Sequence, residues 1–530
     1  MITRGKGTAS IQPAAALAAG EAGFWNRRAV LAAVILLSMV PLLYPPVPPL
    51  VDLLGHMGRY RVQLDLHQSR WLSEYYGFHW AAIGNLGVDL LVVPLGWLVG
   101  LEDAVKLIVL AIPPLTIAGF LWVAREVHGR VPPTAFFALP FVYGFPFLFG
   151  FANFTLSVAL AFLAFGLWLR LARLERTGLR VLLFVPISIL IFFVHAYGWG
   201  VLGLLCFSAE AVRQHDRGVG WLRSGFNAAL SASVMALPLL IMLAWRSETH
   251  GGRTGGWFEW EMKWEWVYSS LRDRWKWFDI GALALAGCAF VGALATRSFT
   301  LSRHLAFSAL VLAAAYVLLP RIIFGSAYAD MRLVPYVFAV ALLAIRSRRA
   351  HYGRSATVLA VLGLAFFGIR IAATTASLAI ASNDQQQKLA ALEHVPMGAR
   401  VASLVTEPCG KYWPLLRNSH LGALVIVRKQ GFSNDQWVLE GMNLLELKYR
   451  KAGLFSSDPS EITHPVRCSG RLSPWSINRA LKALPKQAFD YIWLIDPAQF
   501  DPRLVADLTK VAEGPGWLLF ATGEPPEDAD

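Results

Sequence analysis

The sequence predicts a polytopic α-helical membrane protein with a C-terminal α/β domain outside the cytoplasm. Of its 530 residues, 56% are hydrophobic and only 16% are charged, whereas a soluble chain carries roughly 25% charged residues. The apolar residues also come in blocks that approach the roughly 20 residues needed for one membrane helix. After residue 382 these blocks end and short strand-like runs begin. We therefore expect a membrane domain over 25–382 and an α/β domain over 383–530.

About 11–13 membrane spans are expected, preceded by a disordered cytoplasmic tail at 1–24. Pro and Gly interrupt several apolar segments, which membrane helices tolerate when neighbouring groups satisfy the freed backbone. The expected segments are 28–44, 85–100, 104–124, 134–150, 152–170, 180–194, 196–212, 226–245, 279–296, 303–320, 332–346 and 355–380.

The net charge of +13 is concentrated in short loops between the apolar segments, at 170–180, 213–223 and 346–354. Such clusters are typical of cytoplasmic loops, whereas single-strand nucleic-acid binding would favour a continuous basic groove with aromatic residues for stacking. We therefore expect no nucleic-acid partner. With these loops inside, the protein lies in a bacterial inner membrane and the domain 383–530 lies in the periplasm.

The two ends of the chain give conflicting topologies for the loop 45–84. Counting spans forward from a cytoplasmic N-terminus places this loop outside, whereas counting back from the basic loop 346–354 places it inside. One apolar segment must therefore lie in the membrane without crossing it. The short segment 85–100 is the candidate.

The C-terminal domain is expected to combine strands with a helix. Strands are predicted within 404–413, 489–497 and 516–524, with a helix over 502–513 between the last two. Alternation of strands and helices favours an α/β sheet with some parallel pairing. Cys409 and Cys468 both fall in this domain, and either a disulfide or two free thiols is compatible with the sequence.

The loop 45–84 holds the densest group of candidate functional residues. If its first part is helical, Asp52, His56 and Arg59 share one face, and Arg61 follows. A carboxylate at the membrane boundary is costly unless partnered, which makes it a functional-site hypothesis. The alternative is an amphipathic connector with solvated charges. The sequence contains no P-loop, G-x-G-x-x-G, H-E-x-x-H, C-x-x-C or G-x-S-x-G motif.

Other polar residues recur near the ends of the apolar segments. Asp89, Asn153 and His195 are candidate substrate-binding residues, although a lone His in a turn is more often structural. Asp330 and Arg332 precede the segment 332–346, and Arg is suited to bidentate phosphate recognition. A simple membrane-edge anchor is the competing interpretation.

The expected outer loop 246–278 is rich in tryptophan. Trp257 and Trp260 recur at helical spacing, with Lys263 beside them. An aromatic belt at the membrane interface explains this pattern. The alternative is a surface that stacks on sugar rings or covers a lipid chain.

The pattern resembles the C-fold glycosyltransferases, membrane enzymes that take a sugar from a polyprenyl-phosphate carrier. "VDLLGH" around Asp52 and "DMRLVPYVFAVALLA" at 330–344 carry the resemblance. "DLLGHMGR" is also similar to an uncharacterised group of bacterial membrane proteins that read "DYPNHLAR", matching Asp52, His56 and Arg59. The paired acidic signature of the glycosyltransferases is not intact.

The resemblance implies sugar transfer from a polyprenyl-phosphate donor to an extracytoplasmic glycan, lipid or protein. Asp52 would act as general base, and His56 would orient it or help to bind a metal ion. Arg332, Arg59 and His195 would stabilise the leaving phosphate. The implied partners are membrane lipid, the lipid-linked donor and envelope-assembly proteins. No cofactor is firmly implied, and a divalent metal ion stays open.

Two alternatives remain. One is a lipid or solute transporter or flippase that uses Asp89, His195 and Asp330 as a polar path through the membrane. The other is a non-catalytic subunit of envelope polysaccharide assembly, with 383–530 as its contact surface.

Overall fold

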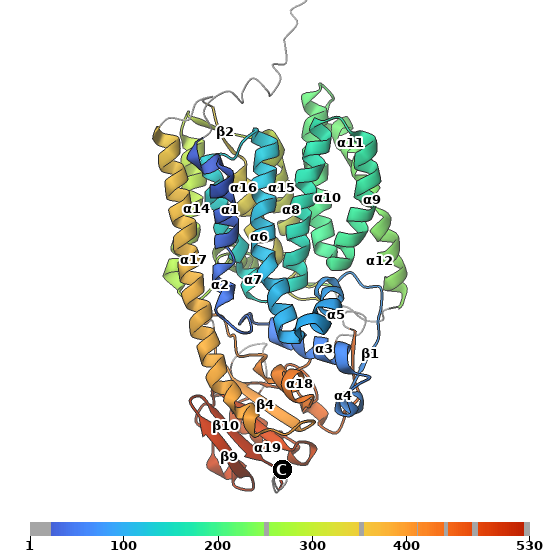
Figure 1. Cartoon of the computed structure of the whole chain (residues 1–530), viewed down its shortest axis with the longest axis vertical. Helices are drawn as coiled ribbons and strands as arrows, with labels where there is room; N and C mark the ends of the chain where they lie inside the picture. The colour runs from blue at the N-terminus through green and yellow to red at the C-terminus, as the bar shows by residue number, and fades with distance from the viewer. Residues whose placement is uncertain are drawn as a thin grey trace, which may run out of the picture.

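The protein is a helical bundle with a strand-containing domain at one end (Figure 1). The computed structural model describes residues 23–248, 254–348, 354–410, 412–438, 444–468 and 475–523. Residues 1–22, most of the expected disordered tail, lie outside this description.

Among the described residues, five helices are long and apolar enough to cross a membrane, and a bent pair makes a sixth. The five are α6 (Leu101–His128), α8 (Ala152–Arg173), α9 (Thr177–Val194), α14 (Lys276–Ala295) and α17 (Arg354–Leu389). The bent pair is α11 (Trp221–Ala232) and α12 (Leu237–Glu248), whose axes differ by 61°. Six of the twelve predicted spans therefore correspond to a helix or a bent helix pair that is long and apolar enough to cross a membrane.

The other bundle helices are shorter or more polar. They are α1 (Arg28–Leu37), α2 (Val40–Leu43), α10 (Ala196–Asp216), α15 (Arg303–Leu318) and α16 (Val334–Leu343). The expected span 134–150 is a 3-10 helix, η3 (Pro133–Tyr143), followed by the short helix α7 (Phe145–Leu148). Prolines at 133, 140 and 146 lack an amide donor, which disfavours a continuous α-helix there.

The segment 85–100 enters the bundle without crossing it. It forms α5 (Gly87–Val99), and before it the amide of Leu86 donates to the carbonyl of Phe193 at the end of α9, at 2.7 Å. After it, Glu102 pairs with Arg428 of the C-terminal domain at 2.9 Å. Both ends of α5 therefore lie on the side of the C-terminal domain. The loop 45–84 lies on the same side, because its strand β1 (Tyr76–Phe78) pairs with β6 (Leu445–Leu447) of the C-terminal domain.

The C-terminal domain is built on a mixed sheet with the order β5-β4-β8-β10-β9. Its strands are β4 (Arg400–Thr406), β5 (Phe432–Ser433), β7 (Ile462–Thr463), β8 (Tyr491–Ile495), β9 (Thr509–Gly514) and β10 (Trp517–Ala521). Strand β4 pairs in parallel with β5, β7 and β8, whereas β10 is antiparallel to β8 and β9. The predicted parallel pairing is present.

The prediction of a helix over 502–513 is wrong. A 3-10 turn, η10 (Pro502–Val505), is followed by the edge strand β9. Gly516 has a φ of +76°, which lets the chain turn back from β9 into β10. An edge strand with polar side chains lacks the apolar signal of a central strand, and its residues here imitate a helical pattern.

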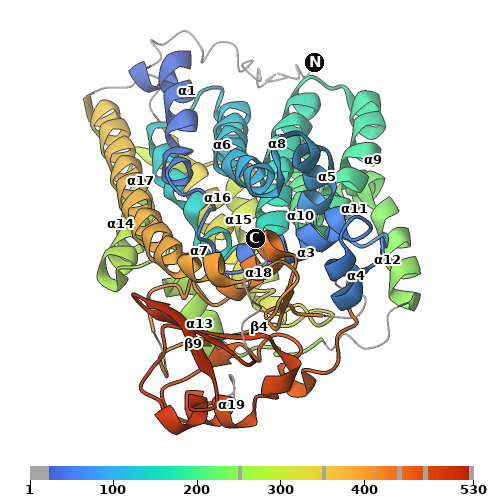
Figure 2. The same cartoon turned by 60° about the horizontal axis from the view of Figure 1, so that its bottom comes forward.

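The first loop and the C-terminal domain share a hydrophobic core. The loop forms α3 (Leu53–Asp65), α4 (Arg70–Tyr75) and β1 (Tyr76–Phe78), and β1 pairs with β6 (Leu445–Leu447). Val62, Leu72 and Tyr76 pack in one cluster with Ile426 and Phe432. Figure 2 shows α3 beside α18 (Leu424–Lys429), with α4 farther out, on the side of the domain that faces the helical bundle. Helix α17 passes through residue 382, the expected domain boundary, and ends at Leu389.

Candidate functional site

A cavity of about 1290 Å³ lies where the bundle, the first loop and the C-terminal domain meet. Its lining combines apolar side chains of α10 and α15 with polar groups from all three parts. Six of the twelve residues predicted from the sequence line it. The polar and aromatic groups used below are Asp52, His56, Asn153, His195, Trp257, Arg332, Glu407, His420, Trp437 and Asp458.

Asp52 is held at the start of α3 by a close backbone approach. Its amide donates to the carbonyl of Phe149 at 2.9 Å. Gly150 adopts a φ of +101°, and a Cβ atom there would lie 2.8 Å from the Asp52 nitrogen, so the turn requires glycine. Burial raises the pKa of the Asp52 carboxyl to about 7, although His420 and Arg332 lower it in part. The carboxyl can therefore exchange a proton near neutral pH.

His420 links Asp52 to a second carboxylate. Its Nε2 lies 3.9 Å from Asp52 Oδ1, and its Nδ1 lies 2.7 Å from Asp435 Oδ1. The other oxygen of Asp435 accepts the Ala423 amide at 3.0 Å, which fixes the carboxylate. Burial opposes the charged imidazole, but the negative charge of Asp435 outweighs it and raises the pKa of His420 to about 9. A charged imidazolium therefore faces Asp52 at neutral pH.

Sequence reasoning missed His420 and Asp435. They occur in "NSHLG" and "SNDQW", which have no motif spacing and lie more than 350 residues from Asp52. The pairing of β1 with β6 and the shared core bring them beside α3. One sequence feature could have pointed to His420. The apolar run "LGALVIV" directly after it indicates a buried core segment next to polar residues.

His56 faces the same cavity through an aromatic contact. The Trp437 ring meets His56 edge to face at 5.0 Å and His420 at 4.9 Å, so it packs against both imidazoles. Gly55 allows this approach, because a Cβ atom would lie 2.5 Å from the Trp437 ring. Burial and the charges of Arg59, His420 and Arg332 lower the pKa of His56 well below its usual value. His56 is therefore neutral and can accept a hydrogen bond.

Arg332 supplies a cation on the bundle side of the cavity. One guanidinium nitrogen donates to Ser326 Oγ at 3.1 Å, another lies 3.4 Å from His195 Nε2, and the group stacks over Phe151 at 4.3 Å. His195 Nδ1 accepts the Tyr197 amide at 3.1 Å, which fixes its ring. Among the described residues, no carboxylate lies within salt-bridge distance of Arg332. The guanidinium can therefore bind an anionic group.

Three predicted residues of the first loop and α5, Arg59, Arg61 and Asp89, form ion pairs inside the protein and do not line the cavity. Arg59 makes two contacts with Asp89, and both side chains are buried. Arg61 pairs with Asp65 at 2.5 Å. Asn153, which does line the cavity, also donates to Asp89 at 3.3 Å. These contacts fasten α3 and α8 to α5.

Lys263 and Asp330, two further residues predicted to bind substrate, form an internal ion pair. Lys263 Nζ lies 3.0 Å from Asp330 Oδ2 and donates to the carbonyls of Tyr316 and Leu319, each at 2.9 Å. This contact joins α13 (Trp260–Tyr268) to the end of α15. Trp260 is 61% exposed and does not line the cavity, whereas Trp257 does.

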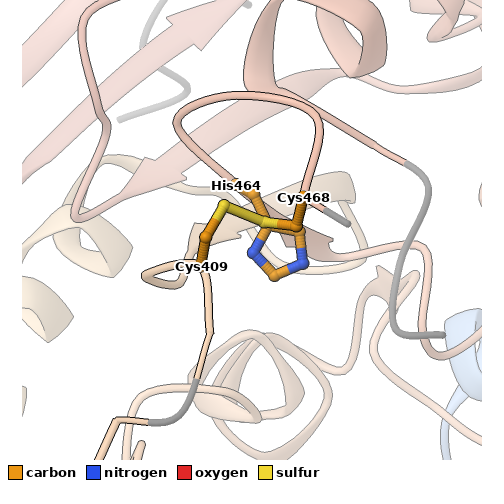
Figure 3. A group of neighbouring side chains, drawn as sticks. All are labelled: Cys409, His464 and Cys468. Carbon is orange, nitrogen blue, oxygen red and sulfur yellow. A yellow bond between two sulfur atoms is a disulfide. The ribbon is translucent and has the colours of Figure 1, made fainter. Parts of the chain in front are cut away.

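The structure pairs Cys409 with Cys468 in a disulfide, with His464 beside it (Figure 3). His464 Nδ1 hydrogen-bonds to the carbonyl of Glu407 at 3.0 Å. Because both thiols are used in the disulfide, this trio is not a metal site. The bridge instead fastens the segment after β4, which brings Glu407 to the cavity.

The fold and the site define an integral membrane protein with a polar cavity between its helices and a C-terminal α/β domain. Two crystal structures of ArnT from Cupriavidus metallidurans are similar to it. The apo structure has a TM-score of 0.48 at 12% identity and covers 93% of this chain and 97% of ArnT. The structure bound to undecaprenyl phosphate has a TM-score of 0.46 at 12% identity, covering 94% and 97%.

Neither a protein-family model nor a curated protein sequence matches the chain.

Proposed function

We propose that this protein is a membrane glycosyltransferase that moves a sugar from a polyprenyl-phosphate donor to a hydroxyl acceptor on the extracytoplasmic side. The observation that carries the proposal is the placement of Asp52 and Arg332 on one cavity. The first is a carboxyl with a pKa raised to about 7, and the second is a buried guanidinium without an acidic partner among the described residues. The polyprenyl-phosphate donor comes from the sequence resemblance.

Asp52 is suited to accept the proton of the acceptor hydroxyl. As the hydroxyl oxygen bonds to the anomeric carbon, its proton moves to the Asp52 carboxylate. A base is most effective when its pKa lies near the working pH, and burial supplies that shift here. The His420 imidazolium keeps part of the Asp52 population ionised, and Asp435 orients His420.

Arg332 is suited to the departing phosphate. The bond between the anomeric carbon and the phosphate oxygen breaks, and the lipid phosphate leaves with its negative charge. A preorganised cation in a site with little water stabilises such charge strongly. Leu204 of α10 and Leu318 of α15 also line the cavity, which gives a lipid chain apolar surface beside the phosphate.

Two observations support an extracytoplasmic site. The disulfide Cys409–Cys468 lies in the same domain as His420, and disulfides persist in oxidising compartments. The basic loop 170–180 joins α8 to α9 at the end of the bundle opposite His195, as expected of a cytoplasmic loop.

The transporter alternative has less support in the described residues. Asp89 and Asp330, two members of its expected polar path, are buried in ion pairs with Arg59 and Lys263. A moving ion or solute would need to break both pairs. The assembly-subunit alternative is tested by the experiment below.

The test is a glycolipid and envelope-glycan profile of cells that carry Asp52→Asn at normal protein level. We expect one sugar modification to disappear, as in a full deletion, with accumulation of its lipid-linked donor. Asp65→Asn, in the same loop but paired with Arg61, is the matched control and should leave the profile unchanged. A deletion phenotype with a normal Asp52→Asn profile would overturn the catalytic proposal in favour of a transporter or an assembly subunit.

A further inference from the structure

The C-terminal domain holds a buried cluster directly behind the cavity lining. His420, Asp435 and Glu461 each bring a ligand-type atom within 4.8 Å of the others. Asp435 and Glu461 are fully buried and His420 is 8% exposed. His420 itself lines the cavity, so the cluster reaches the candidate site from the domain side.

The sheet leaves room for this cluster beside β4. Strand β8 occupies one edge of β4, so β5 and β7 follow one another along the other edge. Asp435 comes just after β5, and Glu461 comes just before β7. The interruption between these two short strands therefore gathers side chains where a continuous strand would make backbone hydrogen bonds.

Among the described residues, no basic side chain forms a hydrogen bond with the buried Glu461 carboxyl, and its side-chain hydrogen-bond partner is the Asp458 carboxyl. Neither of its carboxylate oxygens receives a hydrogen bond from another residue's N–H or hydroxyl group in the described part of the chain. Its charged neighbours are Asp458 and Asp435, which are both acidic. A buried carboxylate without compensation is strongly unfavourable.

Buried carboxylates elsewhere in the described chain have basic partners. Asp89 pairs with Arg59, Asp330 with Lys263, and Asp279 with Arg370 at 2.7 Å. The cluster around Glu461 offers only the His420 imidazole against three acidic side chains. This excess of negative charge favours a bound cation, because the described residues supply no further base to the cluster.

We propose that His420, Asp435 and Glu461 bind one divalent metal ion of the Mn²⁺ or Zn²⁺ type. One imidazole nitrogen with carboxylate oxygens is a donor set that suits these ions, whereas Ca²⁺ and Mg²⁺ prefer oxygen ligands alone. The ion takes the place of the proton between His420 Nδ1 and Asp435, so binding releases a proton. Asp458, which lines the cavity beside His420, adds negative charge near the ion.

The ion would lie on the Nδ1 side of His420, whereas Nε2 of the same ring faces Asp52 at 3.9 Å. The imidazole ring therefore stands between the ion and the cavity. The proposal concerns binding and does not depend on the proposed transfer reaction.

The test is metal binding by the purified full chain in detergent after treatment with EDTA. We expect about one Mn²⁺ or Zn²⁺ per chain, followed for Mn²⁺ by its electron paramagnetic resonance signal and for Zn²⁺ by elemental analysis. Glu461→Gln should weaken binding by about tenfold or more. Glu513→Gln, on the surface strand β9, is the matched control and should bind as the wild type does.

Thermal unfolding provides a second readout. An ion that binds only the folded chain raises its melting temperature, so Mn²⁺ or Zn²⁺ should raise that of the wild type and of Glu513→Gln but not that of Glu461→Gln. A wild type that binds neither ion overturns the proposal, even if Glu461→Gln fails to fold. Equal binding by the wild type and Glu461→Gln also overturns it. In either case the transferase proposal is unaffected, because neither readout uses the reaction.

Discussion

Buried charges have different surroundings in two regions of the molecule. At the contact of α3 with α5, and of α13 with the segment before α16, each acid meets a base: Arg59 with Asp89 and Lys263 with Asp330. Around the cavity, Asp52 lies 3.9 Å from His420 and Arg332 has no acidic partner among the described residues. Paired charges fix the fold, whereas incompletely paired charges remain available to a ligand.

The largest expected effect is the loss of activity in Asp52→Asn. The amide keeps the shape of the carboxylate but cannot accept the acceptor's proton, so turnover should fall by about 10²–10⁴-fold. The melting temperature should stay close to that of the wild type, because Asp52 has no close ion pair. The loss of activity is measured as turnover of the purified enzyme with a lipid-linked sugar donor. The melting temperature is measured by a thermal scan.

Asp89→Asn should show the opposite pattern. Removing this carboxylate leaves the buried Arg59 guanidinium uncompensated and should cost about 3–5 kcal/mol of folding stability. The double variant Arg59→Met with Asp89→Leu should recover much of that loss, since no buried charge is then left. Denaturant or thermal unfolding in detergent measures both. A stable but inactive Asp89→Asn protein would show that Asp89 takes part in the reaction. It would contradict the distinction between paired structural charges and incompletely paired charges around the cavity.

Arg332→Gln should reduce activity by about 10²–10³-fold through loss of charge stabilisation on the leaving phosphate. The effect should fall mainly on turnover rather than on substrate affinity, because the charge develops as the bond breaks. Arg61→Gln removes a cation of the first loop that is paired with Asp65 and serves as the control. Similar kinetics for the two variants would contradict the role given to Arg332.

The smallest expected effect belongs to the disulfide. Cys409→Ser with Cys468→Ser opens a link across 59 residues and should cost about 2–4 kcal/mol. Activity measured well below the melting temperature should persist, because neither sulfur lines the cavity. Unfolding with and without a reductant measures the loss in the wild type. Unchanged stability would show that the contacts of the segment after β4 suffice.

The sequence indicates the membrane fold because long apolar blocks leave few other structures. It also draws attention to the loop 45–84, from which Asp52 and His56 do reach the cavity. It cannot separate Asp52 from Asp89, since the difference lies in a partner from another segment. The sequence does not predict His420 and Asp435 for the same reason, because only the packing of the C-terminal domain on α3 brings them to Asp52. The sequence of the polar edge strand β9 has a helix-like pattern, and only its pairing with β10 identifies it as a strand.

Helix α17 connects the membrane bundle and the C-terminal domain without a hinge. Within the bundle Arg370 pairs with Asp279, and near its far end Lys388 lies 3.1 Å from Asp496 of the domain. Between these points Gln385 donates to the carbonyl of Arg417 at 2.6 Å. A rigid helix anchored at both ends transmits rotation instead of absorbing it, so the domain cannot swing away as a cap. A bulky acceptor must therefore reach the cavity without a swing of the domain away from the bundle.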